Sequence, residues 1–374
     1  MELSLLQENL NLALQNVSRF VAAKAQLPIL NNILFSTDQG RLKLSATNLE
    51  IGINYWLGAK ITKEGSITIP AREITEFVSY LSPGKIDLEL NQNNLLTLSS
   101  PKAESTFTTI PANDFPILPS INPETSFNLD LALLNETISQ VALAAATDDT
   151  RPVLTAILCQ FTADNLLLVA TDGFRLSIKN IKLVNRLKLK TDHQLSTLFI
   201  PARSLIEVTK LARNAKTLTV GLTPDEHQVV FVLEDLELVS RLIEGEYPDY
   251  KRILPDSYKT KVFLNRDEFS QAIKIVSVFA RESANVVKFN IKSSGVELSA
   301  NAPQLGQNKA TVEARVEGEP LEIAFNLKFI SDFISVCQGQ ELVIELNENL
   351  TPGSFRDQSD PSFTHIIMPF RLQD

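Results

Sequence analysis

The chain has 374 residues, which is enough for roughly two or three domains. Hydrophobic residues make up 44% and charged residues 21% of the sequence, so it can bury extensive cores and does not have a disordered composition. The 35 Lys and Arg residues are outnumbered by 44 Asp and Glu residues. The resulting net charge of −9 argues against a simple basic nucleic-acid binder.

The few cysteines and histidines exclude two kinds of site. Cys159 and Cys337 are the only cysteines, so no disulfide framework is expected. His193, His227 and His365 stand in three separate contexts, so we expect neither a metal site nor a cofactor.

No membrane or targeting segment is expected. No run approaches the ~20 apolar residues that cross a bilayer. The N-terminus carries Glu2 and Glu8 where a signal peptide needs basic charge. The simplest interpretation is a soluble protein of the reducing cytoplasm, away from membranes.

The first part of the chain combines a helix with two strands. Apolar residues at helical spacing predict a helix over 8–25, at Leu10, Ala13, Leu14, Val17, Phe20 and Val21. Strand-like runs follow at 27–36 and 41–53, separated by a turn signal at 38–40.

The same order returns twice. A helical stripe from Leu134 to Ala145 precedes strand-like runs at 151–162 and 165–178. A third stripe, from Phe269 to Ala280, precedes strand-like runs at 285–292 and 295–302. Such self-similarity predicts repeated structural units.

A second helix also recurs. Pro70-Ala-Arg opens a stripe over 71–82 and Pro201-Ala-Arg opens one over 202–216, with proline expected in the first turn. A third stripe, over 327–337, lacks the proline. Each is followed by apolar strand-like runs, at 86–100, 217–233 and 341–347.

Proline-rich joints connect the repeats. We call Phe115-Pro-Ile-Leu-Pro119 the first joint and the segment Tyr247 to Pro255 the second joint. They place three domains at residues 1–120, 121–252 and 253–374. The fold class expected is α+β, with antiparallel sheets and two helices per domain. The alternative is ordinary α+β alternation without repeats, which two matched helices in each of three copies disfavour.

Catalytic motifs are missing from the sequence. It contains no glycine-rich phosphate loop, CxxC or HExxH. Asp148-Asp149 and Thr171-Asp172-Gly173 could form a carboxylate site for hydrolysis or metal binding, but a solvated helix end and a turn are the more common explanations of such sequences. We therefore expect no catalytic residues, and a hydrolase using Asp172 stays as a rival hypothesis.

Some helical segments are basic. Arg72 and Arg203 stand at helix starts, where the helix dipole slightly disfavours a cation. They are either ordinary surface charges or contacts for an anionic partner that offsets this cost. Segments 9–25 and 202–216 carry net charges of +2 and +3, whereas 130–149 carries −4. The six helical segments sum to zero, so the rest of the chain holds the whole net negative charge.

Several motifs together resemble one family. They are LPILNNILF (27–35), PARE (70–73), the joint at Asp114-Phe-Pro116, VATDGFRL (169–176), YPDYKRILP (247–255) and MPFRL (368–372). In this order and spacing the chain resembles the bacterial DNA polymerase III β subunit, the replicative sliding clamp. The resemblance covers essentially the whole chain.

The resemblance implies a DNA clamp fold that forms a ring. Three similar domains per chain would assemble as a head-to-tail homodimer around duplex DNA, with helices inside and sheets outside. Contact with DNA would be independent of sequence. The implied clients are the DNA polymerase III catalytic subunit, the clamp loader, and other polymerases and repair proteins.

Three sets of residues follow from the resemblance. The DNA-facing cations would be Lys24, Arg72, Arg203, Lys210, Arg213 and Lys216. The dimer contact would join Phe107 to Val278 and Phe279. A client-peptide groove, with arginines at its rim, would be lined by Leu154, Thr171, Gly173, Phe174, Arg175, Leu176, Pro248, Arg252, Ile253, Ile366, Met368, Pro369, Phe370, Arg371 and Leu372.

Two features depart from the family pattern. Phe174 stands where the family often has His, and Gln373 and Asp374 extend past the usual Arg-Leu end.

A further rival hypothesis is a three-repeat interaction scaffold that never encircles DNA.

Overall fold

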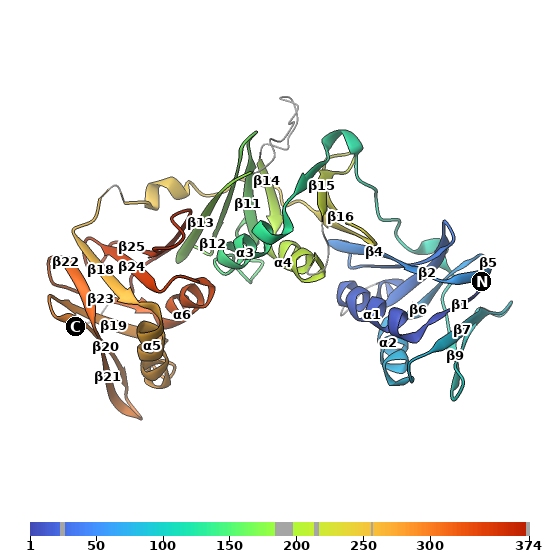
Figure 1. The fold of residues 1–374 in the computed structure, drawn as a ribbon, viewed down its shortest axis with the longest axis horizontal. Helices are drawn as coiled ribbons and strands as arrows, with labels where there is room; N and C mark the ends of the chain where they lie inside the picture. Colours follow the sequence, from blue (N-terminus) through green and yellow to red (C-terminus); the bar gives the residue numbers. More distant parts are fainter. Residues whose placement is uncertain (23–26, 184–196, 213–216, 256, 372–374) are drawn as a thin grey trace. The chain divides into compact units, whose positions relative to one another are not determined.

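The computed structural model describes residues 1–22, 27–183, 197–212, 217–255 and 257–371 (Figure 1). The α-helices described there are α1 (Gln7–Val17), α2 (Ala71–Tyr80), α3 (Leu131–Ala142), α4 (Ala202–Leu211), α5 (Arg266–Ala280) and α6 (Leu327–Val336). All six occur where the apolar spacing predicts a helix. None of the helices in these ranges is long and apolar enough to cross a membrane.

The helices end earlier than the sequence pattern predicts. α1 stops at Val17 and passes into a 3-10 turn, Ser18–Phe20. Pro70 is the N-cap of α2 and the last residue of a strand, so the prediction that it lies in the first helical turn is wrong by one residue. Its φ of −52° and ψ of 118° are extended, which lets the strand run directly into the helix.

The chain forms two compact units. The first contains Met1–Leu131 and Glu207–Leu242. Its strands are β1 (Glu2–Leu6), β2 (Asn32–Asp38), β3 (Arg41–Thr47), β4 (Ile51–Gly58), β5 (Lys60–Lys63), β6 (Ser66–Pro70), β7 (Lys85–Leu90), β8 (Leu95–Ser99), β9 (Glu104–Thr108), β10 (Phe127–Leu129), β15 (Leu218–Leu222), β16 (Gln228–Leu233) and β17 (Leu236–Arg241). They form a five-stranded sheet in the order β5-β1-β7-β8-β9 and an eight-stranded sheet in the order β10-β15-β16-β17-β4-β3-β2-β6.

The second unit contains Ala132–Ile206 and Ile243–Asp374. Its strands are β11 (Ala156–Phe161), β12 (Asn165–Thr171), β13 (Arg175–Lys182), β14 (Thr197–Pro201), β18 (Thr260–Asn265), β19 (Val286–Lys292), β20 (Gly295–Ala302), β21 (Gly306–Val312), β22 (Ala314–Gly318), β23 (Leu321–Asn326), β24 (Glu341–Leu346), β25 (Gly353–Asp357) and β26 (Phe363–Ile367). They form a nine-stranded sheet in the order β14-β11-β12-β13-β26-β25-β24-β18-β22 and a four-stranded sheet in the order β21-β20-β19-β23.

Both large sheets run from one repeat into the next. β4 of the first repeat pairs with β17 of the second, and β13 of the second pairs with β26 of the third. The pairings between named strands in the described ranges are antiparallel, as expected for this α+β pattern. The compact units therefore follow the continuous sheets, whereas the predicted boundaries at 120 and 252 follow the sequence repeats.

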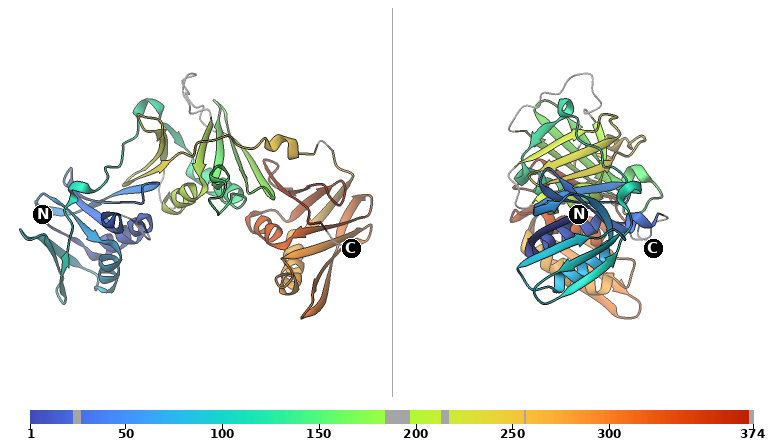
Figure 2. Two further views of the ribbon diagram at one scale, coloured as in Figure 1. Left: turned by 180° about the vertical axis from the view of Figure 1, so that it is seen from behind. Right: turned by 90° about the vertical axis from the view of Figure 1, so that its right-hand side faces the viewer.

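Helices pack in pairs against the sheets. α1 packs on α2 and on β3 and β4, and α5 packs on α6 and on β20 and β21. Figures 1 and 2 show each pair side by side within its own unit. Apolar residues at helical spacing cause this arrangement, because Leu10, Leu14 and Val17 bury one face of α1 completely.

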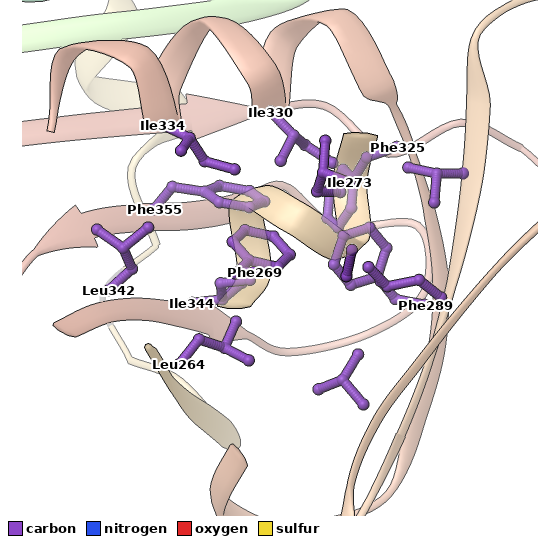
Figure 3. Packing of buried hydrophobic residues seen from close by; sticks show 14 of the residues in the cluster. Leu264, Phe269, Ile273, Phe289, Phe325, Ile330, Ile334, Leu342, Ile344 and Phe355 are labelled. Atoms are coloured by element: carbon purple, nitrogen blue, oxygen red, sulfur yellow. The ribbon is translucent and has the colours of Figure 1, made fainter. Parts of the chain in front are cut away.

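The core of the third repeat is rich in aromatic rings (Figure 3). Phe269 on α5, Phe289 on β19, Phe325 on β23 and Phe355 on β25 form a series of edge-to-face contacts, with centroids 6.2, 5.6 and 5.3 Å apart. Each ring is fully buried, and aromatic pairs in this geometry add stability beyond the area that they bury. This core fixes α5 and α6 against the sheets that carry the C-terminal strand.

Candidate functional site

The candidate site centres on β13, whose two faces differ in chemistry. Leu176 on one face joins a buried apolar cluster, which we call the second-joint cluster: Leu158, Val169, Leu176, Tyr250 and Ile366. β13 and β26 place Leu176 directly opposite Ile366. Half-buried apolar residues, among them Ile253, pack around the cluster. The structure thus brings Leu176, Ile253 and Ile366 of the predicted groove together.

A tight turn between β12 and β13 shapes one end of this surface. The Thr171 hydroxyl donates to the Arg175 carbonyl at 2.7 Å and accepts from the Gly173 N–H at 3.0 Å. Asp172 Oδ1 accepts from the N–H groups of Phe174 and Arg175 at 2.9 and 3.0 Å. Gly173 has a φ of +91°, which favours glycine. The Asp172 carboxylate is therefore committed to the turn, as turn chemistry predicts.

The turn and the C-terminal segment present exposed apolar side chains. Phe174 is 63% exposed, Met368 38% and Phe370 46%. The Met368 N–H donates to the Phe174 carbonyl at 2.8 Å, and the Phe370 N–H donates to the Ala324 carbonyl at 2.7 Å. These bonds hold the segment in place, so exposed apolar groups lie on an ordered backbone. Leu372, also predicted for the groove, lies outside the described residues.

The predicted rim arginines differ sharply from one another. Arg252 has an 85% exposed side chain, paired with Asp249 at 2.8 Å, and Arg371 is also exposed. Arg175 is buried, so the expectation that it lies at a rim is wrong. Asp332, which is 157 residues away in sequence, pairs with its guanidinium and makes that burial possible.

The contacts of Arg175 link three elements. Its Nε donates to Asp172 Oδ2 at 3.0 Å and its Nη1 donates to Asp332 Oδ2 on α6 at 2.6 Å. The guanidinium carbon lies 4.4 Å from the Phe329 ring centroid, a cation–π contact. Arg175 therefore fastens the turn before β13 to α6.

Two further polar side chains, those of Ser177 and Lys179, lie on the same face of β13 as Arg175, because alternate residues of a strand point the same way. Ser177 Oγ lies 2.8 Å from His365 Nδ1. His365 is fully buried and stacks on the Phe333 ring, and burial followed by the charge of Arg175 lowers the pKa of His365 to about 3. The imidazole is thus neutral at physiological pH.

Lys179 completes the row. Its ammonium pairs with Asp360, which also accepts a hydrogen bond from Gln140 Nε2 at 3.0 Å. Burial alone would raise the pKa of Asp360, but hydrogen bonds from Lys179 and Ser362 outweigh it and hold that pKa below its usual value. Arg175, Ser177 and Lys179 form what we call the polar row of β13, and each contacts a residue of the third repeat.

Other predicted groove residues lie around this centre. Pro248 is exposed and Pro369 half-buried. Leu154 is 2% exposed in the 3-10 turn Pro152–Thr155, and within the described residues the second-joint cluster does not include it. Ordinary core packing explains Leu154 as well as a groove wall does.

The predicted DNA-facing cations are only partly described. Arg72 on α2 and Arg203 on α4 are exposed. Lys210 pairs with Glu207 at 2.8 Å, and Arg19 pairs with the same carboxylate at 2.5 Å. The charge of Lys210 is therefore partly balanced. Lys24, Arg213 and Lys216 lie outside the described residues.

The predicted dimer residues lie on two separate surfaces. Phe107 is half-buried on β9, an edge strand, and its ring makes an edge-to-face contact with Phe77 at 5.5 Å. Val278 on α5 is 59% exposed and its neighbour Ile275, three residues earlier, is 45% exposed. Phe279 packs partly against the core of the third repeat.

Comparison with known proteins identifies the family. Residues 1–119, 128–249 and 251–371 match, in turn, the N-terminal, central and C-terminal domain families of the DNA polymerase III beta subunit. The chain belongs to the beta sliding clamp family. The beta sliding clamp of Synechocystis is 31% identical over 391 residues, covering 100% of both chains. That of Bacillus subtilis is 30% identical over 382 residues, covering 99% of this chain and 100% of the relative.

Solved structures agree with this assignment. The DNA polymerase sliding clamp of Bacillus subtilis superposes with a TM-score of 0.92 at 29% identity, and both chains are covered completely. The DNA polymerase III beta subunit of Thermotoga maritima gives 0.90 at 29% identity, again with full coverage. The chain thus has the three-domain clamp fold. It is a non-catalytic processivity factor of DNA polymerase III, with DNA and polymerase as partners.

Two features of this region escape the sequence analysis. Tyr250 belongs to the second-joint cluster, although the motif that contains it points first to Pro248 and Arg252. The polar row is the second, and its signal is the alternation Arg-Leu-Ser-Ile-Lys over 175–179. That alternation predicts a two-faced strand, but it does not say that both faces are buried.

Proposed function

We propose that two copies of this chain associate head to tail into a closed ring around duplex DNA. The proposal rests on family membership along the whole chain, together with open sheet edges in both units. β9 is an edge strand of the first unit, whereas β21 and β22 are edge strands of the second. An open edge is a ready site for pairing with another chain. Because the two edges differ, their pairing is heterologous, and a ring forms when the contacts close.

The proposed contact between the two copies of the chain joins Phe107 of one copy to Val278 and Phe279 of the other. Exposed apolar side chains on α5 favour an apolar contact, since Val278 and Ile275 lie one helical turn apart. The Phe107 ring also contacts the Phe77 ring edge-to-face within the same unit.

Duplex DNA passes through the ring without base recognition. Exposed Arg72 and Arg203, with Lys24, Lys210, Arg213 and Lys216, would face phosphates, while the net charge of −9 disfavours DNA elsewhere on the protein. The ring is retained because it is closed, so binding can stay weak and the clamp can slide. A three-repeat scaffold that never encircles DNA would lack this retention.

Client proteins dock a short peptide on the surface around the second-joint cluster. One apolar side chain would lie near Leu176, Ile366 and Met368, and a second near Leu154 and Pro248. Burial of two such side chains contributes about 3–6 kcal/mol before ordering costs. Micromolar binding of this kind lets the polymerase III catalytic subunit, the clamp loader, and other polymerases and repair proteins exchange on one ring.

Truncation of the C-terminal segment tests this docking surface. Deletion of residues 368–374 should abolish binding of a client peptide and polymerase stimulation, while the dimer survives in sedimentation. Deletion of residues 373–374 alone is the matched control and should leave binding intact. Wild-type affinity after the longer deletion would place the groove elsewhere, and loss of the fold would make the segment structural.

The domain and cellular assignments complete the proposal. Three domains are proposed at residues 1–120, 121–252 and 253–374. The clamp is proposed to act in the cytoplasm, where a bacterial replicative polymerase works.

A further inference from the structure

One carboxylate lies among the cations proposed to face DNA. On α4, Arg203, Glu207 and Lys210 are spaced by four and three residues, so their side chains share one face of the helix. Leu205 and Val208 are buried on the opposite face. Under the proposed function, the face that carries Glu207 is therefore the face that meets phosphates, where a negative charge is unfavourable.

Both oxygens of the Glu207 carboxylate lie against cations. Lys210 Nζ donates to Oε1 at 2.8 Å, and Arg19 Nη2 lies 2.5 Å from Oε2. Arg19 belongs to the 3-10 turn that follows α1, so it comes from a different part of the sequence. The carboxylate thus joins cations of two helical segments, and the charges of the three side chains sum to +1 where the two cations alone would give +2.

The burial of Glu207 strengthens its hold on these cations. Its side chain is 13% exposed, whereas those of Arg19 and Lys210 are 37% and 42% exposed. Salt screens exposed charges strongly but screens partly buried pairs much less. Salt therefore weakens the attraction of the two cations to a DNA phosphate more than it weakens their attraction to Glu207.

We propose that Glu207 limits the affinity of the ring for DNA by keeping Arg19 and Lys210 from full contact with phosphates. The inference rests on the proposed function, because it requires α4 to face the duplex. Glu207 is a positioning residue, since it acts through the two cations and does not itself bind DNA. A closed ring is retained without tight binding, so fewer phosphate contacts favour sliding and do not reduce retention.

The salt dependence of DNA binding tests the proposal. Binding of the intact protein to a fluorescein-labelled duplex of about 30 base pairs is followed by anisotropy between about 50 and 200 mM salt. Each cation released to a phosphate adds about 0.9 to the slope of log K against log salt, so Glu207→Gln should steepen the slope by about 1–2. The loss of affinity over this range should then be about 4- to 16-fold larger than in wild type. A loss of stability in urea with an unchanged slope would make Glu207 a structural residue and overturn the proposal.

Glu76→Gln is the matched control. Glu76 is exposed on α2, one helical turn after Arg72, and its carboxylate accepts from the Tyr80 hydroxyl at 3.4 Å. Because this partner is neutral, the variant removes a charge without releasing an arginine or lysine. Its slope should stay within about 0.5 of wild type. A slope as steep as that of Glu207→Gln would assign the effect to net charge alone and overturn the proposal.

A double-mutant cycle reads the role of Arg19. Arg19→Gln alone should change the slope by less than about 0.5, whereas in the Glu207→Gln background it should reduce the slope by about 1. A reduction of about 1 in the wild-type background would show that Arg19 already contacts a phosphate, which would overturn the proposal. This single variant keeps Glu207, so it decides the matter even where Glu207→Gln fails to fold.

Arg203→Glu distinguishes this proposal from the proposed function, because Arg203 lies on the same face of α4. If Arg203→Glu lowers the slope and Glu207→Gln leaves it unchanged, α4 faces DNA and only the role of Glu207 is wrong. If neither variant changes the slope, α4 does not face DNA and both proposals fail.

Discussion

Replacement of Arg175 by methionine should loosen the second unit. The variant keeps an unbranched side chain of similar length but removes hydrogen bonds to Asp172 and Asp332 at 3.0 and 2.6 Å and the contact with Phe329. Loss of one partner of a fully buried ion pair costs about 3–5 kcal/mol. Because the Asp332 side chain is 32% exposed and is partly screened by water, we expect about 2–4 kcal/mol.

Arg252→Met, in the second joint, is the matched control for Arg175→Met on β13. Arg252 pairs with Asp249 at 2.8 Å, but the two side chains are 85% and 55% exposed. Exposed pairs contribute about 0–1 kcal/mol, so this change should be nearly neutral. Both variants remove the positive charge of an arginine that pairs with an aspartate. A difference between their effects on stability therefore reports the burial of the Arg175 pair and not the loss of charge alone.

Native-state hydrogen exchange of β13 and α6 amides measures the effect locally. Trp56 is the only tryptophan and belongs to the first unit, so the urea transition followed by its fluorescence should stay unchanged. A double-mutant cycle with Asp332→Asn isolates the pair. Equal effects of Arg175→Met and Arg252→Met, or a loss below about 1 kcal/mol, would refute the anchoring role of Arg175.

Three further predictions address the dimer, the buried histidine and the DNA-facing helices. Phe107→Asp should convert a dimer of two 41.5 kDa chains into a folded monomer in sedimentation, whereas Tyr80→Asp, at a 79% exposed position, should not; a persistent dimer would remove Phe107 from the interface. His365 has a folded pKa of about 3, below the value in the unfolded chain, so its contribution to stability is present above pH 6.5 and is lost as the pH falls. Between pH 7 and 5 wild type should lose about 2 kcal/mol more than His365→Gln in urea unfolding, and equal losses would contradict the neutral buried imidazole. Arg203→Glu should reduce the slope of log K against log salt for DNA by about 1, and an unchanged slope would place Arg203 away from the phosphates.

Apolar periodicity predicted the helices because burial selects one face of each. Phe269, Ile273, Val276 and Ala280 lie at the predicted spacing and are all buried in α5. Helix ends were less predictable, since the described part of the 202–216 segment ends its helix at Leu211. Local hydrogen bonding decides such ends, and a stripe of apolar residues carries little information about it.

Strand partners could not be predicted in the same way. Alternation shows which residues of β13 share a face, but the pairing of Leu176 with Ile366 joins residues 190 positions apart. The strand-like runs 41–53 and 165–178 are each divided by a threonine turn into two strands. The hydroxyls of Thr47 and Thr171 bond the backbone there and redirect the chain.

In the candidate site, too, the sequence predicted some features and only the structure shows others. The resemblance indicated the residues around Leu176 and Ile366, and the structure brings them together. It also suggested that Arg175 lies at a rim, because charged residues are usually exposed. Only the distant carboxylate of Asp332 reveals that its burial is compensated.

Retention on circular and linear DNA tests the central claim most directly. Clamps are loaded onto nicked circular duplex by a clamp loader and separated from free protein by gel filtration, before and after a single-site linear cut. The closed ring should stay with the circle at moderate salt and run off the linear molecule. Equal retention on both, or release from both at the same rate, would contradict encirclement.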